Sequence, residues 1–180
     1  RFNKTLPRCE IESVSIEQEL AKMVRAEEIK TNIMATIIKR FLKWVGLKEK
    51  IHNNDSVPPL FKEGEVWWCY IGENVGTEIN GKNEKFTRPV FVLRKYDKYS
   101  FLGLPFTTKT KEGTWYVQIN FVGIKQTVVL SQGRALDYRR FKEKIGELEE
   151  DEVANIRAEY IKLHSSFKNR PPTISDRSRG

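Results

Sequence analysis

The sequence predicts an α+β protein in which a helical N-terminal segment precedes a small β-barrel and a C-terminal helix. Three observations support this fold class. Apolar residues recur at helical spacing over residues 15–45, short runs of strand type follow over 66–130, and helical spacing returns over 149–164. We expect a helical extension over 1–51, a linker over 52–60, a barrel domain over 61–166 and a flexible tail over 167–180.

The N-terminal segment is predicted to form one amphipathic helix, or two helices that meet near Thr31 and Asn32. Its apolar residues recur at steps of three and four, which is the spacing of one helix face. Ser15 with Gln18 fits a capping box at the start, and Gly46 fits the end of the helix. The apolar positions are Ile16, Leu20, Met23, Val24, Ile33, Met34, Ile37, Ile38, Phe41, Leu42 and Val45.

Residues 52–59, HNNDSVPP, interrupt this pattern and are typical of a linker. After them the spacing becomes that of strands, which are separated by clusters of Gly, Asn, Asp and Lys. Short strands at this spacing predict a small closed or half-open barrel. The strand candidates are residues 66–71, 89–93, 101–105, 115–121 and 127–130.

The last predicted element is a helix over residues 149–164. Val153, Ile156, Tyr160 and Leu163 form one apolar stripe, and acidic residues crowd the first turn, where the helix dipole favours negative charge. The tail after it, FKNRPPTISDRSRG, is expected to fray.

The composition is that of a folded, basic protein. Of the 180 residues 39% are hydrophobic, and the formal net charge of +8 favours polyanionic partners because surface Lys and Arg attract phosphate backbones. Cys9 and Cys69 fit no zinc, CxxC or disulfide-framework spacing, so a reducing cytoplasm is the expected location. No apolar run is long enough for a membrane span and no signal-peptide pattern is present, so neither membrane insertion nor export is expected.

Several enzyme classes lack support in the sequence. His52 and His164 are the only histidines, which argues against a two-histidine ribonuclease mechanism and against a His-built metal site. No P-loop, GxGxxG or HExxH pattern appears, so nucleotide hydrolysis and zinc proteolysis are not supported. We therefore expect neither a metal nor another cofactor.

Five motifs follow one another in a characteristic order: EGEVWWCYI, GTEINGKNEKFTRPVFVL, LGLPFTTKTK, VVLSQGRALDYRR, and KEKIGELEEDEV with the last helix. Together they resemble the PemK/MazF family of toxin endoribonucleases over roughly residues 61–163. The resemblance implies a small SH3-like barrel with appended helices, commonly a homodimer. It also implies sequence-selective, metal-independent cleavage of single-stranded RNA to 2′,3′-cyclic phosphate and 5′-hydroxyl ends, and silencing by an antitoxin protein.

Cleavage of RNA through its own 2′-hydroxyl needs a proton acceptor near that hydroxyl, positive charge at the non-bridging oxygens and a donor for the leaving 5′ oxygen. Arg88 matches the Arg-Pro of the family, and we assign it charge stabilisation because a guanidinium is a poor base. Thr107 in PFTT matches the family threonine whose hydroxyl can donate to the scissile phosphate.

Glu78 in GTE matches an acidic position of some relatives and is the candidate base. A neighbouring cation would hold its carboxylate ionised, although the same effect weakens it as a base. The stretch NGKNEKFT separates Glu78 from Arg88 by more residues than in the family. This insertion is alternatively a loop that gates or reads the RNA.

Further residues are assigned to RNA contact. Gln132 and Arg134 in SQGRAL resemble a Gln-x-Arg turn that lies near the RNA groove and the dimer contact in the family, and Ser131 stands where some relatives carry an acid. Phe86, in the polar insertion, is a candidate for stacking on a base, whereas the other strand aromatics are expected mainly in the core. The predicted RNA-binding residues are Thr108, Lys109, Gln132, Arg134, Lys82 and Phe86.

Two alternatives stay open at this stage. The N-terminal helix either packs on the barrel or on a second copy, contacts RNA through Lys39, Arg40 and Lys43, or fills the groove that an antitoxin helix would occupy. The barrel is alternatively a non-catalytic SH3-like module that binds nucleic acid or inhibits another enzyme, because a barrel by itself specifies no activity.

Overall fold

The computed structural model describes the backbone of residues 9–165 and the side chains from residue 18 onward. The predicted flexible tail over 167–180 lies outside these residues. The chain divides into two compact units, Arg1–Gly46 and Leu47–Gly180. The second unit therefore includes the last six residues of the N-terminal helix as well as the predicted linker.

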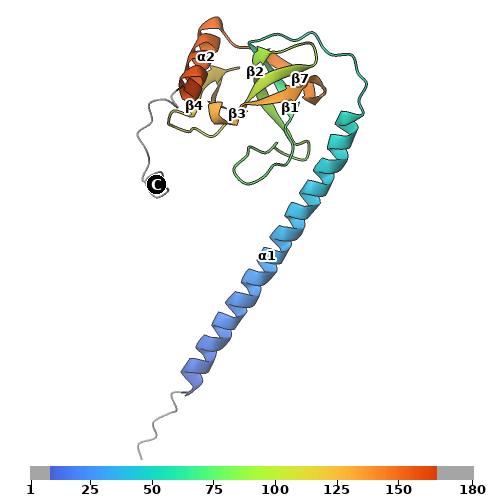
Figure 1. The fold of residues 1–180 in the computed structure, drawn as a ribbon. Helices are drawn as coiled ribbons and strands as arrows, with labels where there is room; N and C mark the ends of the chain where they lie inside the picture. Colours follow the sequence, from blue (N-terminus) through green and yellow to red (C-terminus); the bar gives the residue numbers. More distant parts are fainter. Residues whose placement is uncertain (1–8, 166–180) are drawn as a thin grey trace, which may run out of the picture. The chain divides into compact units, whose positions relative to one another are not determined.

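The N-terminal segment forms one helix, α1 (Cys9–His52), without a break at Thr31 or Asn32 (Figure 1). The predicted limits at Ser15 and Gly46 are wrong, since the helix begins six residues earlier at Cys9 and ends six residues later at His52. Gly46 is tolerated inside the helix because a single glycine costs only about 1 kcal/mol relative to alanine. Lys50 and His52 lie in the last turn, where positive charge favours the helix dipole.

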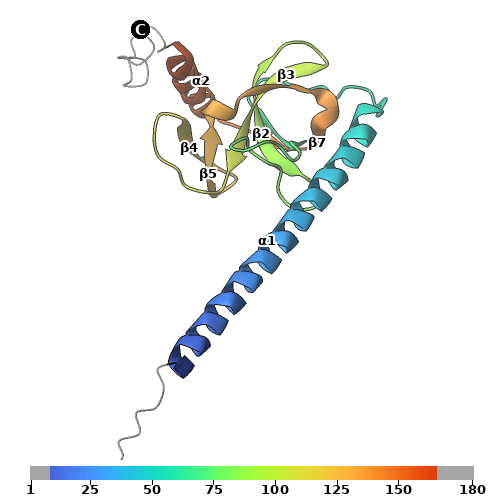
Figure 2. The ribbon, with the colours of Figure 1, turned by 60° about the horizontal axis from the view of Figure 1, so that its bottom comes forward.

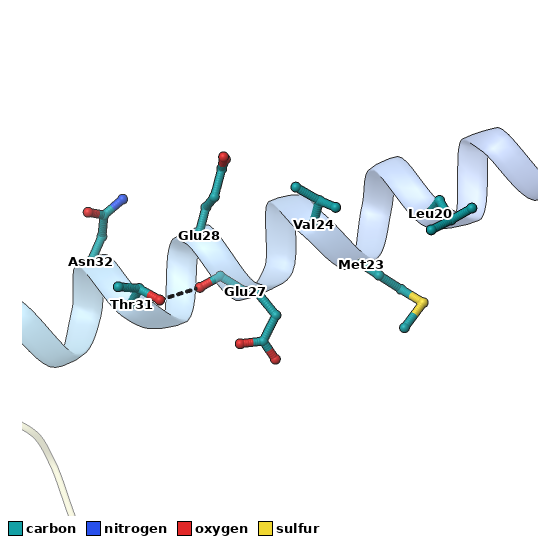
Figure 3. Close-up of a pocket in the computed structure, with 7 residues that line it drawn as sticks. All are labelled: Leu20, Met23, Val24, Glu27, Glu28, Thr31 and Asn32. Atoms are coloured by element: carbon teal, nitrogen blue, oxygen red, sulfur yellow. Dashed lines mark hydrogen bonds between the residues drawn. The ribbon is translucent and has the colours of Figure 1, made fainter.

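Large apolar side chains of α1 are exposed; Leu42, for example, is 69% accessible. Figure 3 shows one stretch of this helix, where Leu20, Met23 and Val24 precede a polar stretch. In the polar stretch the Thr31 hydroxyl donates a 2.9 Å hydrogen bond to the carbonyl oxygen of Glu27, which satisfies the hydroxyl within the helix. Among the described residues of the first unit, no second element is present to bury these apolar side chains.

The second unit is built on a strongly bent antiparallel sheet (Figures 1 and 2). Its strand order is β4-β5-β3-β2-β1-β7, and β6 pairs with the other end of β3. Two 3-10 turns, η1 (Leu130–Gln132) and η2 (Tyr138–Arg140), flank β6. The strands are β1 (Glu65–Tyr70), β2 (Thr87–Lys95), β3 (Ser100–Thr107), β4 (Tyr116–Phe121), β5 (Ile124–Val129), β6 (Arg134–Asp137) and β7 (Phe141–Glu147).

The bent sheet encloses one hydrophobic cluster and packs a second one against α2 (Glu150–Ser165). Alternate residues of β2 separate into the two clusters, with Val90 and Val92 in one and Phe91 and Leu93 in the other. Ile156 of α2 is fully buried in the cluster that contains Phe91. This arrangement confirms the predicted α+β fold class, with a small barrel, a C-terminal helix and an added N-terminal helix.

Strands β6 and β7 were not predicted, and their sequences explain why. β7 reads FKEKIGE, and its side chains are mostly exposed or half-buried, so the strand carries little apolar alternation. β6 has only four residues, with Leu136 as its buried member. Both are held instead by pairing partners that lie far away in the sequence, since β7 pairs with β1 and β6 with β3.

In the described part of the chain, no helix combines the length and the apolar character that a membrane span would require. Cys69 is a free thiol in the core of the barrel, and its burial raises the pKa of that thiol above the ordinary value. The side chain thus behaves as a small apolar residue rather than as a nucleophile.

Candidate active site

A cleft of about 740 Å³ opens where the β1–β2 loop, the end of β3 and the start of β4 meet. The charged residues that line the cleft are all basic, and none of the described lining residues is Asp, Glu or His. Its lining residues are Thr77, Ile79, Lys82, Arg88, Thr107, Lys109, Lys111, Trp115, Tyr116, Val129, Ser131 and Gln132.

The pairing of β2 with β3 brings two predicted catalytic residues into this cleft. Val90 lies opposite Pro105 in the antiparallel ladder. Arg88 and Thr107 each lie two residues from that pair, in opposite directions along their strands, and therefore belong to the same face because side chains alternate. Both side chains line the cleft.

The Arg88 guanidinium is fixed by two backbone carbonyls. Its Nε donates to the carbonyl oxygen of Asn80, and its Nη1 donates to that of Phe106 at 3.1 Å. Partial burial lowers the pKa of Arg88 below the ordinary arginine value, yet the group keeps its charge at neutral pH because that value is very high. The anchored guanidinium is thus a fixed positive charge in the wall of the cleft.

Two adjacent threonines lie at the end of β3 and have different partners. Thr107 is only 8% exposed, and its hydroxyl oxygen accepts a 3.3 Å hydrogen bond from the backbone N–H of Lys109. Thr108 follows the strand, and its hydroxyl accepts a 3.1 Å hydrogen bond from Nζ of Lys82. The Thr107 hydroxyl retains its own proton for donation, because in this contact it acts as the acceptor.

The β1–β2 loop is held in a compact form by internal hydrogen bonds. The Asn80 side chain accepts a 2.6 Å hydrogen bond from the backbone N–H of Asn74 and donates to Glu73 at 3.0 Å. Gly81 passes so close to the backbone of Phe86 that an added Cβ would lie 2.0 Å from the Phe86 carbonyl oxygen. Only glycine fits at that position, and the Asn80 carbonyl that holds Arg88 immediately precedes it.

Gln132 links this loop to the opposite wall of the cleft. Its side-chain oxygen accepts a 3.1 Å hydrogen bond from the backbone N–H of Ile79, and its amide nitrogen donates to the carbonyl oxygen of Thr77 at 3.4 Å. Arg134 lies outside the cleft lining and donates to the carbonyl oxygen of Ile71 at 3.0 Å. Both predicted RNA-binding side chains therefore also support the loop that forms the cleft.

The structure does not place Glu78 and Phe86 among the cleft residues. Glu78 lies between two lining residues, but its carboxylate accepts a 3.3 Å hydrogen bond from the backbone N–H of Val75. Phe86 is only 2% exposed and has a positive φ of 53°. Its carbonyl oxygen accepts hydrogen bonds from the backbone N–H groups of Ile71 and Gly72, which fix the backbone at the residue whose ring is buried. In this structure the Phe86 ring offers no free face to a base.

Other residues of the cleft were not singled out from the sequence as site residues. Trp115 was expected in the core, yet it is 51% exposed at the cleft. Lys111 also lines the cleft and places its Nζ 5.3 Å from the ring centroid of Tyr116. The basic run TKTKEGTW directly after Thr107 is the sequence signal that points to these residues, because it leads from one cleft strand to the next.

The basic lining suits a phosphodiester more than a metal ion. Lys82, Arg88, Lys109 and Lys111 supply positive charge, and the hydroxyl of Thr107 is close to them. Within residues 18–165, whose side chains are described, no cluster of three or more His, Cys, Asp or Glu side chains could bind a metal. The arrangement can bind the non-bridging oxygens of a phosphate and stabilise additional negative charge there.

The chain is similar to one known protein family and to several solved structures. The sequence profile of PemK-like, MazF-like toxins of type II toxin-antitoxin systems matches residues 62–163. The chain is similar to a crystal structure of MazF (Form-I) from Deinococcus radiodurans, with 21% identity and a TM-score of 0.48 over 61% of this chain and 99% of that chain. Curated protein sequences give no significant match.

Two further solved structures show the same kind of likeness. One is the Mycobacterium tuberculosis toxin MazF-mt6, with 15% identity and a TM-score of 0.43 over 57% of this chain and 96% of that chain. The other is an endoribonuclease in complex with its cognate antitoxin from Mycobacterial species, with 13% identity and a TM-score of 0.45 over 63% of this chain and 100% of that chain.

Proposed function

Because the chain belongs to the PemK-like, MazF-like toxins of type II toxin-antitoxin systems, we propose that it is an endoribonuclease that cuts single-stranded RNA. The proposed reaction is sequence-selective and independent of metal ions, and it leaves a 2′,3′-cyclic phosphate and a 5′-hydroxyl. The observation that supports it most directly is the meeting of Arg88 and Thr107 in one basic cleft that has no acidic lining residue among those described.

Charge stabilisation is the proposed role of Arg88. As the 2′ oxygen attacks phosphorus, negative charge builds on the non-bridging oxygens, and a fixed guanidinium stabilises that charge without having to reorganise. Two backbone carbonyls already hold Arg88 in place, so it is oriented before RNA binds. Thr107 is proposed to donate its hydroxyl proton to a phosphate oxygen and so to orient the scissile group.

Glu78 remains the proposed acceptor for the 2′-hydroxyl proton. Its neighbours Thr77 and Ile79 line the cleft, which supports a position at the rim, whereas the hydrogen bond from Val75 occupies one carboxylate oxygen. A Glu78→Gln variant removes the basic group and keeps a similar shape. If Glu78 is the base, cleavage falls by about 10²-fold or more; unchanged cleavage would assign the step to another group or to water.

RNA contact is proposed for the side chains around this centre. Lys82, Lys109 and Thr108 lie beside the proposed phosphate position, and Gln132 lies across the cleft from them. Trp115, with half of its surface exposed, adds an aromatic face on which a base can stack. Arg134 is proposed to act on RNA indirectly, through the loop that it supports.

An antitoxin protein is the proposed partner that silences the activity, and the active form is proposed to be a cytoplasmic homodimer. The family assignment supports the antitoxin, because type II toxins are paired with protein antitoxins. The metal-independent part of the proposal is supported by the cleft lining, which offers neither carboxylates nor imidazoles among its described residues.

Incubation of the purified protein with a long RNA in the presence of EDTA tests the proposal. Cleavage that EDTA does not reduce is the expected result. RNA binding without cleavage would instead favour a non-catalytic SH3-like module, and neither binding nor cleavage would favour an inhibitor of another enzyme. An Arg88→Ala preparation serves as the control for contaminating ribonuclease, because a contaminant is indifferent to that substitution.

A further inference from the structure

Unlike a typical surface lysine, Lys82 is held by hydrogen bonds at both its backbone N–H and its side-chain amine. Its backbone N–H donates a 2.9 Å hydrogen bond to the carbonyl oxygen of Thr87, just before Arg88, and forms an isolated bridge there. Its side-chain amine donates to the Thr108 hydroxyl at 3.1 Å. The amine is therefore fixed over the end of β3, on the side of the cleft that also contains Arg88 and Thr107.

The proposed reaction needs a proton for the leaving 5′ oxygen, and the cleft has few groups that can supply one. Arg88 holds its protons too strongly, and no carboxyl or imidazole group is present among the described lining residues, which leaves the three lysines and Tyr116 as candidate donors. Lys82 is exposed as a residue, yet desolvation of its amine, followed by the like charges of Arg88 and Lys109, lowers the pKa of that amine below the ordinary lysine value. Its ammonium form is thus a stronger acid than that of a lysine without charged neighbours.

We propose, on the premise that the RNA cleavage described above is correct, that Lys82 is the general acid that protonates the leaving 5′ oxygen. The 2′ oxygen forms a bond to phosphorus while its proton passes to Glu78 or to water. The bond between phosphorus and the 5′ oxygen breaks, and its electron pair takes a proton from the Lys82 ammonium. The neutral amine then recovers a proton from solvent, so that the enzyme returns to its starting state.

The geometry supports different roles for Arg88 and Lys82, two of the four cationic side chains that line the cleft. Arg88 is anchored by carbonyl oxygens and stays charged throughout, which suits the non-bridging oxygens. The Lys82 amine is hydrogen-bonded to the neutral hydroxyl of Thr108. That hydroxyl accepts a hydrogen bond from the ammonium and can donate one to the neutral amine after the proton has left, because a hydroxyl both donates and accepts. No charged side chain therefore loses its hydrogen-bonding partner when Lys82 transfers its proton.

The test compares two versions of one RNA oligonucleotide that contains a mapped cleavage site. One has the natural 5′ oxygen at the scissile bond, and the other has sulfur there, which leaves as a thiolate and needs no protonation. Single-turnover cleavage of both is measured for the wild type, Lys82→Met, Lys82→Arg and Lys109→Met. Lys109→Met is the matched control, since it removes the same charge from the same cleft.

Lys82→Met is expected to cut the natural RNA about 10²- to 10⁴-fold more slowly and the sulfur RNA within roughly tenfold of the wild type. Lys82→Arg keeps the charge without releasing a proton, so it should show the same contrast even if Lys82→Met disturbs the loop. Lys109→Met should slow both substrates to a similar extent, with only a small extra loss on the natural RNA, because its charge is the smallest of the three causes that lower the pKa of Lys82. Equal losses on both substrates for the two Lys82 variants, or no loss on either, would overturn the assignment. A wild type that cuts neither RNA would overturn the proposed function itself.

Discussion

Nη1 of Arg88 donates a 3.1 Å hydrogen bond to the carbonyl oxygen of Phe106, so the guanidinium at the start of β2 is fastened to the end of β3, directly beside Thr107. The contact spans the two central strands of the sheet and faces the basic cleft. It makes the charge and the hydroxyl of the proposed centre parts of one rigid element.

Arg88→Ala should lower RNA cleavage by about 10²- to 10³-fold while the protein stays folded. The substitution removes the fixed charge from the cleft, and the carbonyl oxygens of Asn80 and Phe106 can bond to water instead, because Arg88 is only partly buried. Single-turnover cleavage together with circular dichroism measures both effects. Arg88→Lys should recover only part of the activity, since an ammonium cannot span both carbonyls. Full activity in Arg88→Ala would exclude the proposed charge stabilisation.

Thr107→Val should slow cleavage by roughly tenfold, which corresponds to the loss of about one hydrogen bond in the transition state. Valine keeps the shape and the strand preference of threonine, so the core and the pairing with β5 should persist. Thr108→Val is the matched comparison, because it removes the adjacent hydroxyl that binds Lys82. A larger loss of cleavage rate in Thr108→Val than in Thr107→Val would instead assign the main role to the Lys82–Thr108 pair.

Gly81→Ala should disturb the β1–β2 loop and reduce cleavage without a substitution of any proposed catalytic residue. The new Cβ would lie 2.0 Å from the Phe86 carbonyl oxygen, so the loop must move and the Asn80 carbonyl with it. We expect a loss of about 1–3 kcal/mol in the free energy of unfolding and a clear loss of activity. Gly46→Ala is the control in denaturant unfolding, since a Cβ at that helical glycine meets no atom within 4 Å. Equal behaviour of the two variants would contradict this account of the loop.

Cleavage should decline as the pH rises through the pKa of Lys82, because the proposed proton donor acts in its ammonium form. Desolvation of the amine and the charges of Arg88 and Lys109 lower that pKa, so the decline should begin at a lower pH than a lysine without charged neighbours would give. Rates measured from neutral to alkaline pH should show this descending limb in the wild type and lack it in the residual activity of Lys82→Arg. The same limb in Lys82→Arg would attribute it to another group.

The sequence predicted the barrel well because its central strands are continuous apolar runs bounded by polar turn residues. Residues 89–93 fall within β2, and 101–105 fall within β3, the two strands that form the middle of the sheet. β7 was not predicted because most of its side chains are polar, and β6 because it has only four residues; the positions of both depend on pairing with distant strands. Helix α1 extends beyond the expected limits at Ser15 and Gly46. The helical pattern continues on both sides of these residues and outweighs their local capping signals.

The candidate site was predictable only where a motif marked it. Arg88 and Thr107 were found through their motifs, and antiparallel pairing then explains why they share a face. The contact from Gln132 to Ile79 joins residues 53 positions apart, and no local pattern indicates it. Phe86 likewise looked available because its neighbours are polar, whereas its ring is buried at a residue whose backbone is fixed by hydrogen bonds to its own carbonyl oxygen.

The most direct test of the central claim is to map the ends of a long RNA after incubation with the wild type and with Arg88→Ala, both in EDTA. The account predicts that the wild type cuts at a limited set of sites and leaves 2′,3′-cyclic phosphate and 5′-hydroxyl ends, and that Arg88→Ala leaves the RNA intact. An RNA that both proteins leave uncut, or that both cut alike, would contradict it.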